Sequence, residues 1–111
     1  MLPALPDGAA VLIQKPMGPD LATARAIRAL CRQNGLKAAV SFQLRFAPMM
    51  MAARAMIEAG EIGDLLEVEV HLNIFTPWIL FPFLIPMKRV EIAVHSVHYL
   101  DTIRALAGTP K

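Results

Sequence analysis

A lysine and two histidines are the side chains of this sequence best suited to moving a proton. Lys15 follows the apolar run at residues 9–13 and precedes Pro16, whereas His95 and His98 lie in a pattern of helical spacing. An ammonium at the end of a strand and an imidazole on a helix are groups that acid–base chemistry on an alcohol or a carbonyl requires. The sequence therefore predicts a site built from the end of a strand and one face of a helix.

The position of Lys15 suits a ligand contact. In open α/β sheets, ligands bind at the carboxyl ends of the strands, and Lys15 stands at such an end. Pro16 fixes its own φ and disfavours a helix that starts at Lys15, so the chain turns there. The ammonium could then contact a ribose or a substrate hydroxyl; the alternative is a solvated lysine at a strand end.

The histidines lie on a predicted helix at residues 90–107. Glu91, His95 and His98 follow i, i+4, i+7 spacing and therefore share one face. We expect His98 to act as a general base, because an unperturbed imidazole titrates near neutral pH. Asp101 could orient His98 or cap a neighbouring backbone group. The alternative is a surface face with ordinary histidines.

Metal binding is a further alternative for this face. Carboxylate and imidazole side chains one and two turns apart can bind zinc or iron. The order here is Glu-x-x-x-His-x-x-His, however, and not the His-Glu-x-x-His of zinc proteases. We therefore expect no metal at the site.

Arg45 and Trp78 are candidates for ligand contacts outside the helix. Arg45 ends the predicted second strand, where an arginine can pair with phosphate or carboxylate, or can tie down a loop by bonding its carbonyls. Trp78 lies in the proline-rich apolar segment at residues 74–87 and is a weaker candidate for lining a pocket.

Composition excludes several classes of protein. Of the 111 residues 56% are apolar, and the net charge is +2 with the basic residues scattered, which argues against nucleic-acid binding. The single cysteine, Cys31, excludes an internal disulfide and favours a reduced, cytoplasmic setting. The N-terminus lacks the pattern of a signal peptide. Residues 74–87 are too short and too rich in proline to span a membrane, so we expect no membrane association.

The predicted elements alternate between strands and helices. Asp20 is a suitable N-cap for the first helix, and Gly35 is suited to end it. Residues 66–74 alternate apolar and polar side chains and form the clearest strand pattern. This order predicts an α/β to α+β architecture. The elements are strands at 9–13, 36–46 and 66–74, and helices at 21–34, 49–59 and 90–107.

The motifs occur in an order that resembles the Gfo/Idh/MocA family (glucose-fructose oxidoreductase, inositol dehydrogenase and relatives). Members of this family join a nicotinamide-binding Rossmann domain to an α+β domain with a large open sheet. Gln14 and Val94 stand where many members have an acidic residue, and Ser96 where they have glycine. The matching motifs are Gln14-Lys15-Pro16, Arg45-Phe46-Ala47-Pro48, Gly60-Glu61-Ile62-Gly63, the helical stretch at residues 94–101 and Leu106-Ala107-Gly108.

This resemblance implies hydride transfer between NAD or NADP and a sugar or polyol. It implies that Lys15 contacts the nicotinamide ribose and the substrate hydroxyl, and that His98 is the acid–base group. We expect cofactor contacts from Lys15, Pro16 and Arg45. We expect substrate contacts from Lys15, His95, His98 and Trp78.

The resemblance also implies a chain shorter than a complete family member. Residues 1–47 would be the C-terminal part of a Rossmann-type domain, and residues 48–111 the start of the substrate domain. No Gly-x-Gly-x-x-Gly precedes the first strand, so we expect no pyrophosphate site and no dehydrogenase activity in these residues alone. The competing hypothesis is a small interaction or structural domain that binds a partner, or a second copy of itself, through an exposed sheet edge.

Overall fold

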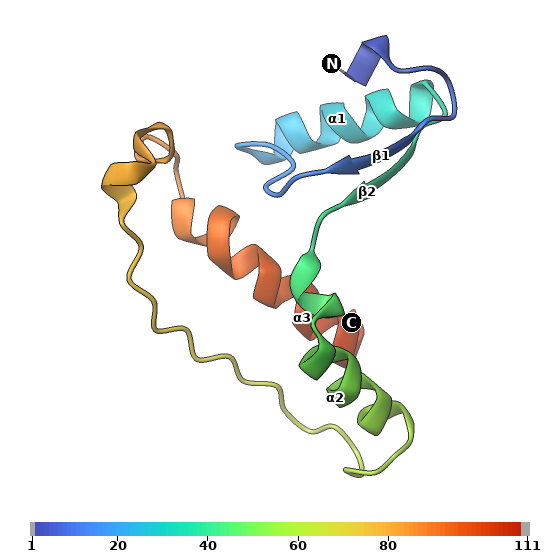
Figure 1. Cartoon of the computed structure of the whole chain (residues 1–111), viewed down its shortest axis with the longest axis vertical. Helices are drawn as coiled ribbons and strands as arrows, with labels where there is room; N and C mark the ends of the chain where they lie inside the picture. The colour runs from blue at the N-terminus through green and yellow to red at the C-terminus, as the bar shows by residue number, and fades with distance from the viewer. Residues whose placement is uncertain (1, 110–111) are drawn as a thin grey trace. The chain divides into compact units, whose positions relative to one another are not determined.

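The computed structural model describes residues 2–109 and divides at Ser41 and Phe42 into two compact units. The first unit is a β–α–β arrangement, and the second is mainly helical (Figure 1). Three helices of 11 to 13 residues and a two-stranded parallel sheet agree with a part of an α/β protein. The Rossmann-type assignment of residues 1–47 and the substrate-domain assignment of residues 48–111 stay predictions.

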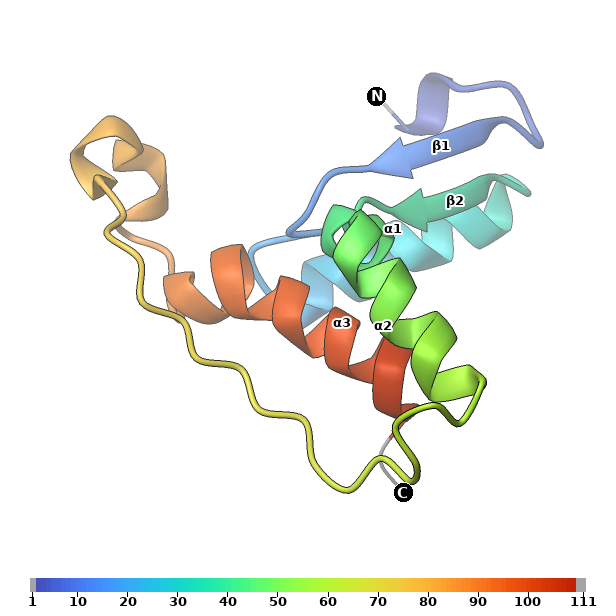
Figure 2. The same ribbon diagram turned by 60° about the horizontal axis from the view of Figure 1, so that its bottom comes forward.

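The first unit contains strand β1 (Ala10–Ile13), helix α1 (Leu21–Gln33) and strand β2 (Lys37–Val40). The strands are parallel, and the register runs from Ala10 opposite Lys37 to Ile13 opposite Val40. Figure 2 shows the two strands side by side, with α1 across one face. Cys31 on α1 and Leu36 before β2 are the buried apolar side chains of this unit.

The ends of α1 agree with their sequence signals. Asp20 Oδ1 accepts a hydrogen bond of 2.7 Å from the backbone N–H of Thr23, which would otherwise have no partner in the first helical turn. Gly35 has φ of 58°, a left-handed conformation that glycine adopts at no steric cost. The predicted first helix is therefore confirmed with its N-cap and its terminating glycine.

The second strand is shorter than predicted. The sequence suggested residues 36–46, but β2 ends at Val40, and Gln43–Phe46 form a 3-10 turn. The cause is the length of the partner strand: β1 ends at Ile13, whose carbonyl accepts a final bond of 2.8 Å from Ser41 N–H. Beyond Ser41, no strand among residues 2–109 continues the ladder.

The second unit is built from α2 (Pro48–Glu58), a π-helical segment (Ile92–Ser96) and α3 (Val97–Ala107). Helix α3 packs against α2 and against the turn Gln43–Phe46. The predicted helices at 49–59 and 90–107 are thus confirmed, but the second contains a π-helical stretch in which Val97 N–H reaches the carbonyl of Ile92. Such wider turns often occur at functional sites.

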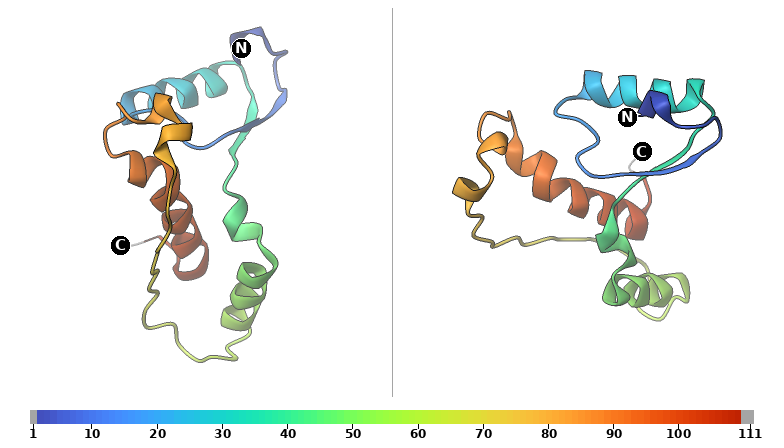
Figure 3. Two further views of the ribbon diagram at one scale, coloured as in Figure 1. Left: turned by 60° about the vertical axis from the view of Figure 1, so that its left-hand side comes forward. Right: turned by 45° about the horizontal axis from the view of Figure 1, so that its top comes forward.

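The strand predicted at residues 66–74 is absent. Residues 65–77 have no regular secondary structure, and Figure 3 shows them as an extended segment that leads from α2 to the short turns before α3. Leu66 and Phe75 are 93% and 91% exposed. An alternating pattern specifies two faces, but a strand forms only beside a partner with free backbone groups, and residues 2–109 provide none here.

The fully buried side chains of α3 are polar. His98 and Thr102 are buried, whereas Ile92 and Leu100 are exposed. The turn Gln43–Phe46 and α2 pack against α3, and Val97, Ile103 and Leu106 on its apolar side are half-buried. On α2, Met49, Met51 and Met56 are exposed, whereas Met50 is half-buried.

Among residues 2–109, no helix is both long enough and apolar enough to cross a membrane.

Candidate functional site

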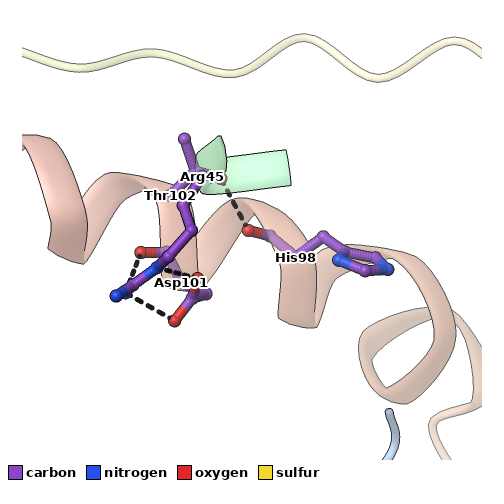
Figure 4. A network of polar contacts seen from close by, with 4 residues as sticks. All are labelled: Arg45, His98, Asp101 and Thr102. Carbon is purple, nitrogen blue, oxygen red and sulfur yellow. Dashed lines mark hydrogen bonds and ion pairs between the residues drawn. The ribbon is translucent and has the colours of Figure 1, made fainter. Parts of the chain in front are cut away.

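His98 is the most buried of the candidate site residues. It lies in the first turn of α3, and its residue exposure is 6%. The Phe42 ring meets the imidazole edge-on, with ring centroids 6.1 Å apart at an angle of 84°. The hydroxyl of Thr102 donates to the His98 carbonyl oxygen at 2.9 Å, one turn further along the helix (Figure 4). Aromatic packing and the helix together restrict the orientation of this imidazole, which suits a group that must meet a ligand in a fixed geometry.

Arg45 binds Asp101, a contact between the start of the second unit and its last helix. Nε lies 2.6 Å from Oδ2 and Nη2 lies 2.7 Å from Oδ1, and Nη2 also reaches the Asp101 carbonyl oxygen at 3.3 Å (Figure 4). The geometry is the two-pronged one that arginine forms with carboxylates. Of the roles considered for Arg45, the structure shows pairing with a carboxylate and bonding to a carbonyl within the chain.

The partner of Asp101 was not found from the sequence. Its carboxylate accepts hydrogen bonds from the Arg45 side chain, and the roles predicted for it, orienting His98 or capping a backbone group, stay predictions. The two residues are 56 positions apart, so no local spacing signals the pair. The sequence showed only that Arg45 ends a predicted strand and that Asp101 lies on a distant predicted helix. Neither position indicates that the two residues form a pair.

His95 and Trp78 come together, as two of the expected substrate residues. Their ring centroids lie 5.7 Å apart with the rings tilted by 54°. Trp78 begins the 3-10 turn Trp78–Leu80, whereas His95 belongs to the π-helical segment. His95 Nδ1 also lies 2.8 Å from Glu91 Oε2, and the His95 side chain is 21% exposed. The segment therefore presents an imidazole held by a carboxylate on one side and by an indole on another.

Lys15 and Pro16 lie just beyond the carboxyl end of β1 in the first unit. The peptide bond between them is cis, and both residues are partly buried. A lysine ammonium donates hydrogen bonds to oxygen acceptors, and the predicted contact of Lys15 with a cofactor stays a prediction. Lys15 and His98 belong to different units, so their convergence on one substrate stays a prediction.

A cavity of about 290 Å³ lies in each unit. The cavity of the first unit is lined by α1 and β2, including Arg28, Cys31 and Arg32. The cavity of the second unit is lined by Arg45, Arg54 and Glu58, among others. Neither is lined by the candidate lysine or histidines. Among residues 2–109, no three side chains of metal-binding type converge on one point.

Three curated proteins resemble this chain. The chain is 33% identical to the uncharacterized oxidoreductase YhhX of Escherichia coli over 107 residues, which cover 96% of this chain and 31% of YhhX. It is 34% identical to trans-1,2-dihydrobenzene-1,2-diol dehydrogenase of Bos taurus over 70% of this chain and 25% of that enzyme. The Mus musculus enzyme of the same name is 40% identical over 59% of this chain and 20% of the enzyme.

All three relatives are named as oxidoreductases or dehydrogenases, which supports both the resemblance to the Gfo/Idh/MocA family and a part of an oxidoreductase. The chain spans about a third or less of the length of these relatives. No protein-family model matches the chain. No solved structure matches it at a significant level.

Proposed function

We propose that these residues are the central part of a nicotinamide-dependent dehydrogenase of the Gfo/Idh/MocA family that oxidises a sugar or polyol. The observation that carries the proposal is the similarity to a named oxidoreductase over 96% of the chain. The buried, aromatic-packed His98 supports it, because this residue stands where the family resemblance expects the acid–base group. The activity belongs to a protein longer than these residues, which we call the parent dehydrogenase.

In the proposed reaction, His98 takes the proton of the substrate hydroxyl. Bound NAD or NADP would accept the hydride from the carbon that carries this hydroxyl. The hydroxyl then becomes a carbonyl, and the two electrons of the C–H bond leave with the hydride. Lys15 donates a hydrogen bond to the substrate oxygen and another to the nicotinamide ribose, which orients both partners.

The cofactor would be held by Lys15, Pro16 and Arg45. Lys15 and Pro16 follow the end of β1, where open parallel sheets bind their ligands. Arg45 uses Nε and Nη2 on Asp101, so Nη1 is the part of its guanidinium outside that pair. The 111 residues contain no Gly-x-Gly-x-x-Gly, and the pyrophosphate would therefore bind to other residues of the parent dehydrogenase.

The substrate would carry a secondary alcohol. The names of two relatives specify a cyclic diol, trans-1,2-dihydrobenzene-1,2-diol. A cyclic diol shares with sugars and polyols a carbinol carbon beside a second hydroxyl. Trp78 and His95 suit such a molecule, because an aromatic ring can cover its apolar face while an imidazole nitrogen bonds a hydroxyl.

The test is the oxidation of cyclic diols and polyols by the parent dehydrogenase, followed through the absorbance of the reduced nicotinamide. The substitution His98→Gln removes the general base, and kcat is expected to fall by about 100-fold or more. Glu69→Gln changes an exposed carboxylate of the extended segment and serves as the control. Unchanged kcat in His98→Gln would contradict the assignment.

A cofactor titration tests the part of the proposal that concerns these 111 residues. NADH and NADPH are expected not to bind the 111-residue chain with micromolar affinity, because the phosphate-binding turn is missing from its sequence. Micromolar binding by these residues would contradict the proposal that the pyrophosphate binds to other residues of the parent dehydrogenase.

Self-association is a second candidate function. The extended segment and the turns after it expose Leu66, Phe75 and Ile79 almost fully, and unpaired backbone next to apolar side chains can pair with another chain. A homo-oligomer through this segment, in the cytoplasm, is the form we propose. Light scattering after size-exclusion chromatography measures the mass, and a monomer at high protein concentration would remove this candidate.

A further inference from the structure

Glu91 and His95 form a hydrogen-bonded pair one turn before His98. The distance of 2.8 Å joins His95 Nδ1 to Glu91 Oε2. An ionised carboxylate only accepts hydrogen bonds, so the proton of this bond must be on Nδ1. In a neutral imidazole the other nitrogen, Nε2, is then an acceptor. Carboxylates that fix the tautomer of a functional histidine in this way are common partners of metal-bound and catalytic imidazoles.

The Trp78 indole, from the 3-10 turn Trp78–Leu80, contacts the same imidazole. The indole and imidazole centroids are 5.7 Å apart, and the indole comes from a turn that lies between the extended segment and the π-helical segment. With the carboxylate bond and the ring contact together, rotation about the side-chain bonds of His95 is restricted. The His95 side chain is 21% exposed, so a ligand can reach it.

We infer that Glu91 is a positioning residue, which keeps His95 Nε2 as a hydrogen-bond acceptor for a second substrate hydroxyl, beside the one that His98 deprotonates. This inference rests on the proposed function. It narrows the substrate class to molecules with two neighbouring hydroxyls, of which Trp78 would cover the apolar face.

The first arm of the test measures the tautomer without substrate. The chain has three histidines, so nitrogen NMR of protein labelled in histidine resolves each ring, with His71→Gln and His98→Gln used for assignment. In the unsubstituted protein the His95 proton is expected on Nδ1. Glu91→Gln is expected to convert His95 to a mixture of tautomers, because an amide binds the Nδ1–H less strongly than a carboxylate does.

Glu69→Gln is the matched control for this arm. Glu69 also bonds a histidine, His71, at 2.7 Å, but both side chains are largely exposed. The control removes the same charge and is expected to leave the His95 signals unchanged. A His95 proton on Nε2 in the unsubstituted protein, or an unchanged tautomer in Glu91→Gln, would overturn the inference.

The second arm measures kinetics in the parent dehydrogenase with a cyclic vicinal diol and with the matching mono-alcohol. Glu91→Gln is expected to lower the ratio of kcat/KM values, diol over mono-alcohol, by about tenfold, the effect of one hydrogen bond. The loss should appear in the KM for the diol, because a bond to the non-reacting hydroxyl is present before and during the reaction.

The two arms separate the possible failures. A parent dehydrogenase that oxidises neither alcohol contradicts the proposed function even if the tautomer result holds. A dehydrogenase that is active, but whose ratio is the same in Glu91→Gln as in the unsubstituted enzyme, contradicts only the role given to the Glu91–His95 pair.

Discussion

The β–α–β arrangement of the first unit and the extended segment at residues 65–77 both carry strand patterns, yet only the first forms strands. In the first unit, β1 and β2 pair along four residues, and α1 covers one face (Figure 1). The extended segment alternates apolar and polar residues more regularly than β1 does, but no neighbouring strand lies beside it within residues 2–109. The comparison shows that alternating side chains are not sufficient for a strand, which also needs hydrogen bonds to the backbone of a neighbouring strand.

Replacing a leucine by alanine in each of the two regions is expected to give the largest difference in unfolding free energy. Leu36→Ala removes a buried side chain of the first unit and is expected to cost about 2 kcal/mol of unfolding free energy. Leu66→Ala removes a side chain that is already exposed and is expected to change this free energy by less than about 0.5 kcal/mol.

The reactivity of the single cysteine, Cys31, measures the stability of the first unit in both variants. Cys31 is buried, and its reaction with a thiol reagent reports the opening of the surrounding structure. A cost of about 2 kcal/mol corresponds to a reaction about 30-fold faster in Leu36→Ala, with no comparable change in Leu66→Ala. Equal rates in the two variants would show that the first unit has no stable core.

The ion pair of the second unit gives the next largest effect. Asp101→Ala leaves the partly buried Arg45 without its carboxylate and is expected to destabilise this unit by about 1.5 kcal/mol. The single tryptophan, Trp78, reports unfolding of this unit in urea through its fluorescence. A double-mutant cycle with Arg45→Ala should give a coupling of about 1 kcal/mol. A coupling of zero would mean that the two residues stabilise the unit independently.

The smallest effect concerns pH and the first turn of α1. The hydrogen bond from the Thr23 backbone, with a further one from its side chain, lowers the pKa of Asp20 below its ordinary value of 3.8. A carboxyl group with a lowered pKa in the folded state stabilises the fold above 3.8, and this contribution is lost as pH falls through the folded-state value.

The helical signal in circular dichroism should therefore decrease slightly below about pH 4. Asp20→Asn keeps a capping acceptor but cannot titrate, so it should remove that part of the decrease. An identical acid profile in Asp20→Asn would assign the whole transition to other carboxyl groups.

The elements with complete local signals were predictable from the sequence. Asp20 and Gly35 mark the ends of α1 because capping depends on neighbouring residues alone. The parallel pairing of β1 and β2 follows from the helix between them. By contrast, the length of β2 depends on where β1 ends, and that information lies 24 or more residues away in the sequence.

The candidate site was predictable by residue type but not by partner. The sequence identified His95 and Trp78 separately, and the structure brings their rings together. It gave no sign that Arg45 would bind Asp101, or that His98 and Thr102 rather than Leu100 would be the buried residues of α3. Burial on a helix depends on what packs against it, and the turn Gln43–Phe46 and α2 pack against α3.

The Arg45–Asp101 pair has a consequence for synthesis on the ribosome. The β1–β2 pairing of the first unit lies within residues 10–40, so all its partners are available once Ser41 has left the exit tunnel. Arg45 emerges shortly afterwards but has to wait for 56 further residues before its carboxylate partner appears. Throughout that interval the apolar residues between them are exposed to chaperones and to other nascent chains, which makes the synthesis of residues 46–101 a vulnerable period.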